Sequence, residues 1–267
     1  MRWLTSAFEW QSRAVMGRHF RLYMSDWHIK VLPPALEPVT MLVAFGFGLG
    51  AYMGSIEWGE REVSYLSFVA PGMLAYAAFM TPFFQTLYAA FIRMHYQRTW
   101  EGQLTTQIEM PHVVWGEIFW AAVLGTMYVT VVALVLTVFC ALGLLTIELA
   151  WLPAVIPFAF LSGCAFGAIG LCFTGIVPTI DHMNLPIFLL VLPLGFASAT
   201  YFPLGHPVLI AIATANPLYH LAEGLRGLLL GGPALWHLAL LVSMCVLIVV
   251  IMVPLAMRLL RRRVLGE

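Results

Sequence analysis

One polar stretch decides how this chain folds: Arg98-Thr-Trp-Glu-Gly-Gln-Leu-Thr-Thr-Gln-Ile-Glu-Met-Pro111. It separates two apolar runs, residues 65–92 and 113–145, and each run exceeds the roughly 20 residues that cross a bilayer as a helix. A polar segment between two spanning helices must lie in water at one membrane face. Its apolar side chains recur at helical spacing: Leu104, Ile108 and Met110. The stretch therefore predicts a short surface helix over 99–110.

The composition indicates an all-α membrane protein. Of the 267 residues 61% are hydrophobic and only 10% are charged, whereas soluble domains carry about 25% charged residues. A net charge of zero argues against a nucleic-acid partner, which would require a basic surface. The four cysteines all lie in apolar runs without metal-ligand spacing, so we expect small buried side chains and no metal site. The first 30 residues lack the uninterrupted apolar core of a cleavable signal peptide.

The apolar runs predict one transmembrane domain over residues 1–267 with six membrane-spanning helices. The expected spans are 36–54, 65–92, 113–145, 153–177, 185–201 and 236–260. Residues 1–30 mix aromatic and basic side chains, including Arg18 and Arg21, and are too polar to span. They favour an amphipathic helix lying in the membrane interface in contact with lipid; the alternative is a partly ordered tail.

A different pattern lies between the fifth and sixth spans. Residues 203–232 contain two apolar pieces broken at Asn216-Pro217, and each piece is too short to cross the membrane. Together they can enter and leave on one side, and such a re-entrant helical hairpin is tolerated where it is buried in protein or lines a wet cavity.

The basic residues predict the orientation. Six spans place both termini on one side, and the loops of that side carry eleven of the thirteen basic residues, the other side only Arg61 and Arg226. This bias predicts cytoplasmic termini and a cytoplasmic 99–110 helix, with residues 203–232 facing outward. The expected location is a bacterial inner membrane.

The chain lacks the means to hydrolyse ATP by itself. A phosphate-binding loop of the G-x-x-x-x-G-K-[ST] type needs a lysine, and the only lysine, Lys30, precedes a valine. Ion-coupled carriers usually keep carboxylates within the membrane, but we expect Glu37 and Glu117 near cytoplasmic ends and Glu223 in the outer hairpin. The sequence therefore indicates a membrane module driven by a separate motor.

Three segments carry a family resemblance. They are Arg98-Thr-Trp-Glu-Gly-Gln-Leu followed by Pro111 and Glu117; Tyr201-Phe-Pro-Leu followed by Asn216-Pro-Leu-Tyr-His-Leu-Ala-Glu-Gly-Leu-Arg226; and Leu36-Glu-Pro-Val-Thr followed by Gly46-Phe-Gly-Leu-Gly50. Their order and spacing resemble type-2 ATP-binding cassette (ABC) permeases. The third segment is similar to the first span of the nodulation lipo-oligosaccharide exporter branch.

The resemblance implies that the 99–110 helix is a coupling helix seated in a cytoplasmic ABC ATPase. The residues it assigns to this contact are Thr99, Trp100, Glu101, Gly102, Gln103, Leu104, Thr105, Ile108 and Pro111. The alternative for Glu101 is a solvated charge at a helix start. ATP and magnesium would bind to that partner, and this chain would hold no cofactor. A second copy of the permease would complete a homodimer.

Six further residues have expected structural or gating roles. Glu117 ties the N-terminal helix or the surface helix in place, or is an interfacial carboxylate that reaches water. In the outer hairpin Asn216 caps a helix that begins at Pro217. His220, Glu223 and Arg226 fall near one face of that helix, where Glu223 and Arg226 can pair. We expect an outer gate that locks that end of the protein; the alternative is direct contact with cargo.

The resulting hypothesis is the permease subunit of an ABC exporter for an amphiphilic cargo such as a lipid-linked saccharide or lipid. Candidate cavity aromatics are Tyr52, Tyr76, Phe79, Phe83, Phe84, Tyr88 and Tyr128, although such residues on apolar helices usually serve packing. The alternatives are a drug or antibiotic efflux permease and a non-transporting scaffold. An intramembrane enzyme is disfavoured because adjacent Asp181 and His182 diverge on a helix.

Overall fold

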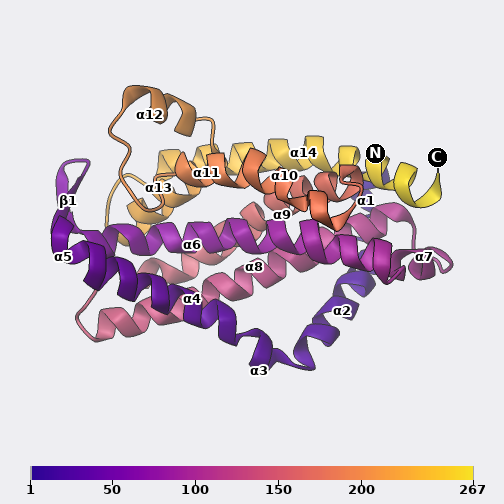
Figure 1. The fold of residues 1–267 in the computed structure, drawn as a ribbon, viewed down its shortest axis with the longest axis horizontal. Helices are drawn as coiled ribbons and strands as arrows, with labels where there is room; N and C mark the ends of the chain where they lie inside the picture. Colours follow the sequence, from indigo (N-terminus) through magenta and orange to yellow (C-terminus); the bar gives the residue numbers. More distant parts are fainter. Residues whose placement is uncertain (1, 267) are drawn as a thin grey trace.

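The computed structural model describes residues 2–266. Four helices in this part of the chain are long and apolar enough to cross a membrane, and they lie side by side along the long axis of the molecule (Figure 1). They are α6 (Tyr65–Phe84, continued by π-helical turns to Tyr96), α8 (Met110–Ala141), α9 (Leu152–Ile176, after a 3-10 turn from Leu149) and α14 (Leu235–Leu265). These helices overlap closely with the predicted second, third, fourth and sixth spans.

Small side chains let the long helices pack closely. A Cβ atom on Gly163 of α9 would lie 2.8 Å from the backbone of Ala122 of α8, so only glycine fits there. Thr86, where α6 opens into a π-helical turn after Pro82, donates its hydroxyl to the Pro82 carbonyl at 3.0 Å. That bond satisfies a backbone acceptor where the regular helix is interrupted.

Two shorter apolar helices cover this bundle at the positions of the predicted first and fifth spans. The first consists of α4 (Leu32–Val43), a π-helical turn (Ala44–Leu49) and α5 (Gly50–Met53). The second runs from Ile180 to Phe196 and includes α10 (Asn184–Pro186) and α11 (Leu192–Phe196). It begins and ends about five residues before the predicted 185–201, because the chain turns at Ala199, whose φ is 54°.

The N-terminal segment is broken where the sequence predicted one helix. It forms α1 (Arg2–Thr5), α2 (Trp10–Met24) and α3 (Trp27–Lys30). The break after α2 occurs at Ser25 and Asp26, where the Ser25 hydroxyl bonds both the Leu22 carbonyl and the Asp26 carboxylate. The Ser25 hydroxyl and the Lys30 ammonium lower the pKa of the Asp26 carboxyl. Such local bonds compete with helix continuation.

The two ends of the molecule are different. Both termini and α7 (Thr99–Leu104) lie at one end, which we call the α7 end (Figure 1). The opposite end carries an antiparallel hairpin, β1 (Ser55–Trp58) and β2 (Arg61–Ser64), where the sequence predicted only a loop. We call it the hairpin end. It also holds α12 (Pro207–Ala213), which projects from the bundle, and α13 (Pro217–Leu229), which is buried against α6 and α14.

Candidate functional site

A buried carboxylate joins four elements at the α7 end. Glu117 of α8 is fully buried, and its Oε1 accepts hydrogen bonds from Arg93 Nε and Trp100 Nε1, each at 3.0 Å. Its Oε2 lies 2.5 Å from Arg93 Nη2, and His19 Nε2 of α2 lies 3.2 Å from Oε1. A buried charge is tolerated only when it is paired and hydrogen-bonded. This network, which we call the Glu117 junction, therefore connects α2, the end of the α6 helix, α7 and α8.

One side of helix α7 packs against the bundle, and the other side is exposed. Arg98 takes a left-handed conformation (φ 49°) that turns the chain out of the preceding helix. Trp100 then points inward and is fully buried, whereas Glu101 and Gly102 are exposed. Trp100, which was expected to contact a partner, is therefore an internal anchor. The exposed face of α7 is formed by Glu101 and Gly102, which follow Trp100 in the sequence.

The predicted 99–110 helix is too long. Helix α7 ends at Leu104, where Thr105 and Thr106 donate their hydroxyls to backbone carbonyls three residues earlier, a local alternative to the helical ladder. Helix α8 begins at Met110, so Pro111 lies in its first turn. Leu104 and Ile108 are half-buried against the core, and Gln103 is half-buried.

Helix α2 is fastened along the first turns of α8. His112 and Glu9 contact each other at 2.7 Å, and the Trp115 indole donates to the Trp3 carbonyl at 2.6 Å. A Cβ on Gly116 would lie 2.5 Å from Val15, so the glycine permits this close approach. These contacts hold α1 and α2 against the first turns of α8.

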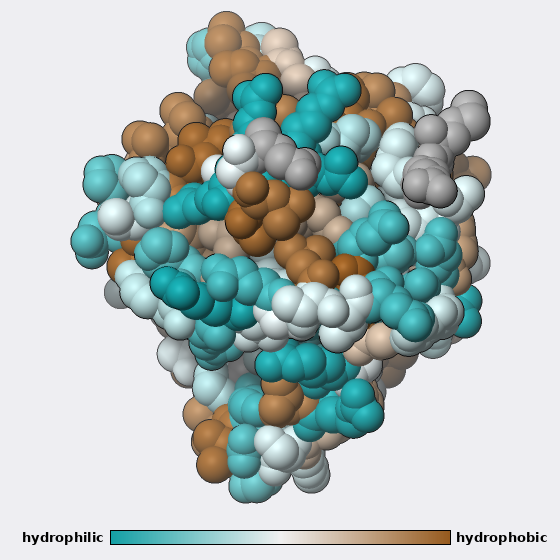
Figure 2. Space-filling model, turned by 90° about the vertical axis from the view of Figure 1, so that its right-hand side faces the viewer, coloured by the Kyte–Doolittle hydropathy of each residue, from teal (hydrophilic) through white to brown (hydrophobic). Residues whose placement is uncertain are grey.

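The surface at the α7 end combines polar and apolar groups. Figure 2 views this end and shows hydrophilic side chains around a small number of apolar ones. A cavity of about 190 Å³ lies between α7 and the end of α14, lined by residues that include Arg98, Glu101 and Arg263. A larger one of about 430 Å³ lies between α2 and the α6 helix and includes Arg18. Arg21 is exposed.

A second buried charge network lies at the hairpin end. Arg226 of α13 is fully buried and pairs with Glu223, with Nη1 2.6 Å from Oε1. It also donates to the Phe68 and Thr200 carbonyls, each at 2.9 Å, and to the Ala199 carbonyl. This network, which we call the Arg226 knot, joins α13 to α6 and to the chain after α11. Every acceptor is a backbone carbonyl or the paired carboxylate, which suits the fixed fork of guanidinium donors.

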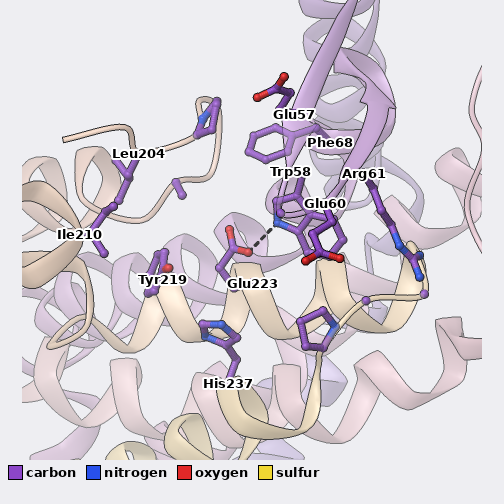
Figure 3. Close-up of a pocket in the computed structure, with 16 residues that line it drawn as sticks. Glu57, Trp58, Glu60, Arg61, Phe68, Leu204, Ile210, Tyr219, Glu223 and His237 are labelled. Atoms are coloured by element: carbon purple, nitrogen blue, oxygen red, sulfur yellow. Dashed lines mark hydrogen bonds between the residues drawn. The ribbon is translucent and has the colours of Figure 1, made fainter. Parts of the chain in front are cut away.

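The β1–β2 hairpin and the residues around the start of α13 also make hydrogen bonds close to the Arg226 knot. The Trp58 indole donates to Glu223 Oε2 at 2.8 Å (Figure 3). Asn216 caps α13 by accepting from the Leu218 amide at 2.9 Å, and Pro217 occupies the first turn. The buried His220 bonds the Thr214 carbonyl through Nε2 at 2.9 Å and meets His237 at 3.1 Å between Nδ1 atoms. The five residues expected at the outer gate thus all belong to one buried helix, α13, or to its cap.

The Arg226 knot borders a cavity of about 650 Å³ that opens at the hairpin end. Glu57, Trp58, Glu60 and Arg61 line it from the hairpin, and Tyr219, Glu223 and His237 line it from α13 and α14 (Figure 3). Across residues 2–266 no group of three or more His, Cys, Asp or Glu side chains is placed to hold a metal ion.

Comparison with known proteins supplies the family. A family model described as ABC-2 type transporter matches residues 11–230. The chain belongs to the ABC-2 type transporter family. This ABC-2 permease is 33% identical to nodulation protein J of Rhizobium leguminosarum bv. viciae, over 94% of both chains. It is 31% identical to nodulation protein J of Sinorhizobium fredii over 96% of this chain and 95% of the relative, and 30% identical to that of Rhizobium meliloti over the same shares.

Family membership makes the chain the membrane subunit of a transporter and not a catalytic enzyme. The predicted cavity aromatics of this ABC-2 permease occupy different environments in the structure. Phe79 and Phe83 are fully buried in the core, so they serve packing. Tyr76 and Tyr128 line a groove between α4, α6 and α8, and Tyr52 is 91% exposed.

Sequence reasoning missed several residues of both networks. Arg93 and Trp58, which each donate to a carboxylate that was singled out, and His19, which lies 3.2 Å from Glu117, were not themselves singled out. A signal for Arg93 was available. It follows the predicted span 65–92, and the next span, 113–145, carries Glu117 near its start. His19 and Trp58 carried no comparable signal because their partners are about 100 or more residues away.

Proposed function

We propose that this chain is the permease subunit of an ATP-driven exporter that moves an amphiphilic cargo, such as a lipid-linked saccharide or a lipid, out of the cytoplasm or inner leaflet. The ABC-2 family match and the relatives named nodulation protein J support this function, as does the resemblance of residues 36–50 to the nodulation lipo-oligosaccharide exporter branch. Two identical permease chains would work with two ABC ATPase chains, which bind ATP and magnesium.

In this arrangement the two shorter apolar helices complete six crossings, and both termini lie in the cytoplasm. Support comes from the distribution of basic residues: Arg93, Arg98 and Arg263 of the 261–263 triplet lie around α7, at the end where the termini are (Figure 1). An excess of basic residues marks the cytoplasmic side of bacterial inner-membrane proteins. The α7 end would therefore face the ATPase, and the hairpin end would face outward.

The Glu117 junction is the single observation that carries the coupling mechanism. Exposed Glu101 and Gly102 would contact the ATPase, while Trp100 on the same short helix bonds the Glu117 carboxylate inside the bundle. When ATP-driven closure displaces α7, the displacement reaches α8, Arg93 and α2 through one shared carboxylate. Packed, hydrogen-bonded elements transmit such a shift because they move as rigid bodies.

The test is co-purification of the chain with candidate ABC ATPases from its own genome, followed by ATP hydrolysis in nanodiscs. Glu101→Arg is expected to dissociate the complex or to reduce hydrolysis at least tenfold. The matched control is Glu62→Arg, which makes the same charge change on the exposed hairpin at the opposite end. If no ATPase binds the wild-type chain, or if Glu101→Arg behaves like Glu62→Arg, α7 is not the coupling helix.

A further inference from the structure

When the hydrocarbon core is placed over the apolar helix that begins at Tyr65, Glu37 falls near its middle, whereas the sequence predicted a position near the cytoplasmic face. It lines a groove between α4, α6 and α8 together with Tyr76, Tyr128 and Tyr201. Tyr76 follows Tyr65, the first residue of α6, by eleven positions, which corresponds to roughly 16 Å of helix. The hydrocarbon core is about 30 Å thick, so this carboxylate is close to half-way across. Figure 1 shows why: α2 runs obliquely from the α7 end to α3, and α4 begins well along the length of the bundle.

Among the residues that the structure describes, the Glu37 carboxylate has no basic partner to neutralise it. Its side chain is exposed, and within residues 2–266 it takes part in no hydrogen bond or ion pair. A carboxylate facing hydrocarbon at this depth is strongly disfavoured, and intramembrane carboxylates normally face a wet cavity or a polar partner. The face of α4 that carries Glu37 therefore borders a hydrated pathway.

The chemistry of the groove points to the kind of group that it receives. Glu37 accepts hydrogen bonds, and the Tyr76 and Tyr201 hydroxyls donate or accept them. The Tyr128 hydroxyl donates to the Lys30 carbonyl at 3.3 Å and can still accept. All three rings offer faces that pack against sugar rings. The Tyr76 and Tyr201 rings lie 5.8 Å apart in an edge-to-face arrangement. No basic side chain lines the groove in the described part of the chain, so an anionic headgroup would meet a single uncompensated negative charge.

We propose that Glu37, Tyr76, Tyr128 and Tyr201 form a subsite that binds the uncharged, hydroxyl-rich headgroup of the cargo half-way across the membrane. The cavity of about 60 Å³ at its centre has room for a few water molecules, so it admits one hydroxyl-bearing substituent of the headgroup. This inference rests on the proposed export function. It adds the headgroup chemistry and the residues that meet it.

The first test asks whether water reaches the groove, and it needs no ATPase partner. Met41 lines the groove beside Glu37, so Met41→Cys reports on it while leaving the subsite in place. The background is Cys140→Ser, since the other three cysteines are buried. In nanodiscs, a charged methanethiosulfonate is expected to react with Met41→Cys at least tenfold faster than with Val250→Cys, which is exposed on α14. Equal, slow reaction at both positions would overturn the proposal.

The second test asks what the groove binds. Decyl maltoside, decyltrimethylammonium and decyl sulfate, each below its micellar concentration, are compared as protectants of Met41→Cys. The maltoside is expected to slow labelling at least fivefold, and Glu37→Gln to raise its half-protecting concentration at least fivefold. Glu62→Gln is the control and should leave that concentration unchanged. Stronger protection by the ammonium compound, or equal protection by all three, would overturn the saccharide assignment. Failure of an ATPase to bind would instead remove the export function and leave these labelling results standing.

Discussion

Trp100 of α7 donates its indole N–H to Oε1 of Glu117 in α8 at 3.0 Å, and both side chains are fully buried. The exposed Glu101 is the next residue of α7. A six-residue helix has little stability of its own, so this bond and the burial of the indole hold α7 in position. The exposed surface of α7 is thereby attached directly to the long helix α8.

Removing only this hydrogen bond should loosen α7. Trp100→Phe keeps an aromatic ring and loses the N–H, and a hydrogen bond to a charged group contributes about 1.5–3 kcal/mol. We expect faster hydrogen exchange across residues 99–104 and a lower melting temperature. Trp151→Phe, at a half-exposed tryptophan of the hairpin end, is the control and should change neither. Unchanged exchange in α7 would show that packing alone holds it.

Removing the carboxylate should be more severe than removing one donor. Glu117→Gln leaves the Arg93 guanidinium largely buried without its counter-charge, and breaking a buried pair in this way costs about 3–5 kcal/mol. The measurement is thermal or detergent-induced unfolding of the purified chain.

A double-mutant cycle separates the pair from its surroundings. Arg93→Gln combined with Glu117→Gln should be less destabilising than the sum of the two single changes, because no unpaired charge remains. Strictly additive effects would contradict a direct Arg93–Glu117 interaction.

The long spans could be predicted from sequence because hydropathy depends only on local composition. The predicted 65–92 and 236–260 agree with helices Tyr65–Tyr96 and Leu235–Leu265. The break at Asn216-Pro217 was also readable, since cap residues and proline act locally. The count of six crossings goes further than the four long helices that the described chain contains.

The remaining features depend on contacts between distant residues. Trp100 reads as a surface residue in a polar stretch, and its burial follows from Glu117, 17 positions away. Glu37 reads as the start of a span, and its place beside Tyr76 and Tyr128 follows from the oblique path of α2 and α3 past α8. The β1–β2 hairpin pairs Glu57 with Glu62, residues whose charge predicts a loop. Its Trp58 is held by Glu223, 165 positions away.

The contact of α2 with α8 depends on one glycine. Gly116→Ala should push α2 outward, since the added Cβ would lie 2.5 Å from Val15 and overpacking costs about 1–3 kcal/mol. We expect faster trypsin cleavage at Arg13 of α2. Val15→Gly in the same chain should restore part of the resistance, although glycine in a helix itself costs about 1 kcal/mol. If Val15→Gly does not slow the cleavage of Gly116→Ala, the two residues are not in contact.

The Arg226 knot should depend on the shape of the guanidinium and not only on its charge. Arg226→Lys retains the positive charge but cannot reach Glu223 together with the Phe68, Thr200 and Ala199 carbonyls, which Arg226 contacts through three different nitrogens. Each buried acceptor left without a donor costs about 1–3 kcal/mol. We therefore expect a large fall in melting temperature and faster proteolysis of the 197–216 segment.

The control for this change is Arg61→Lys at the same end of the molecule. Arg61 is exposed and donates to the Leu230 carbonyl, and surface substitutions usually change stability by less than about 0.5 kcal/mol. If Arg226→Lys is as mild as Arg61→Lys, charge alone stabilises the knot, and α13 is free to move without breaking a directional network. If only Arg226→Lys destabilises the chain, opening of the hairpin end requires that several guanidinium bonds break together, as expected of a lock.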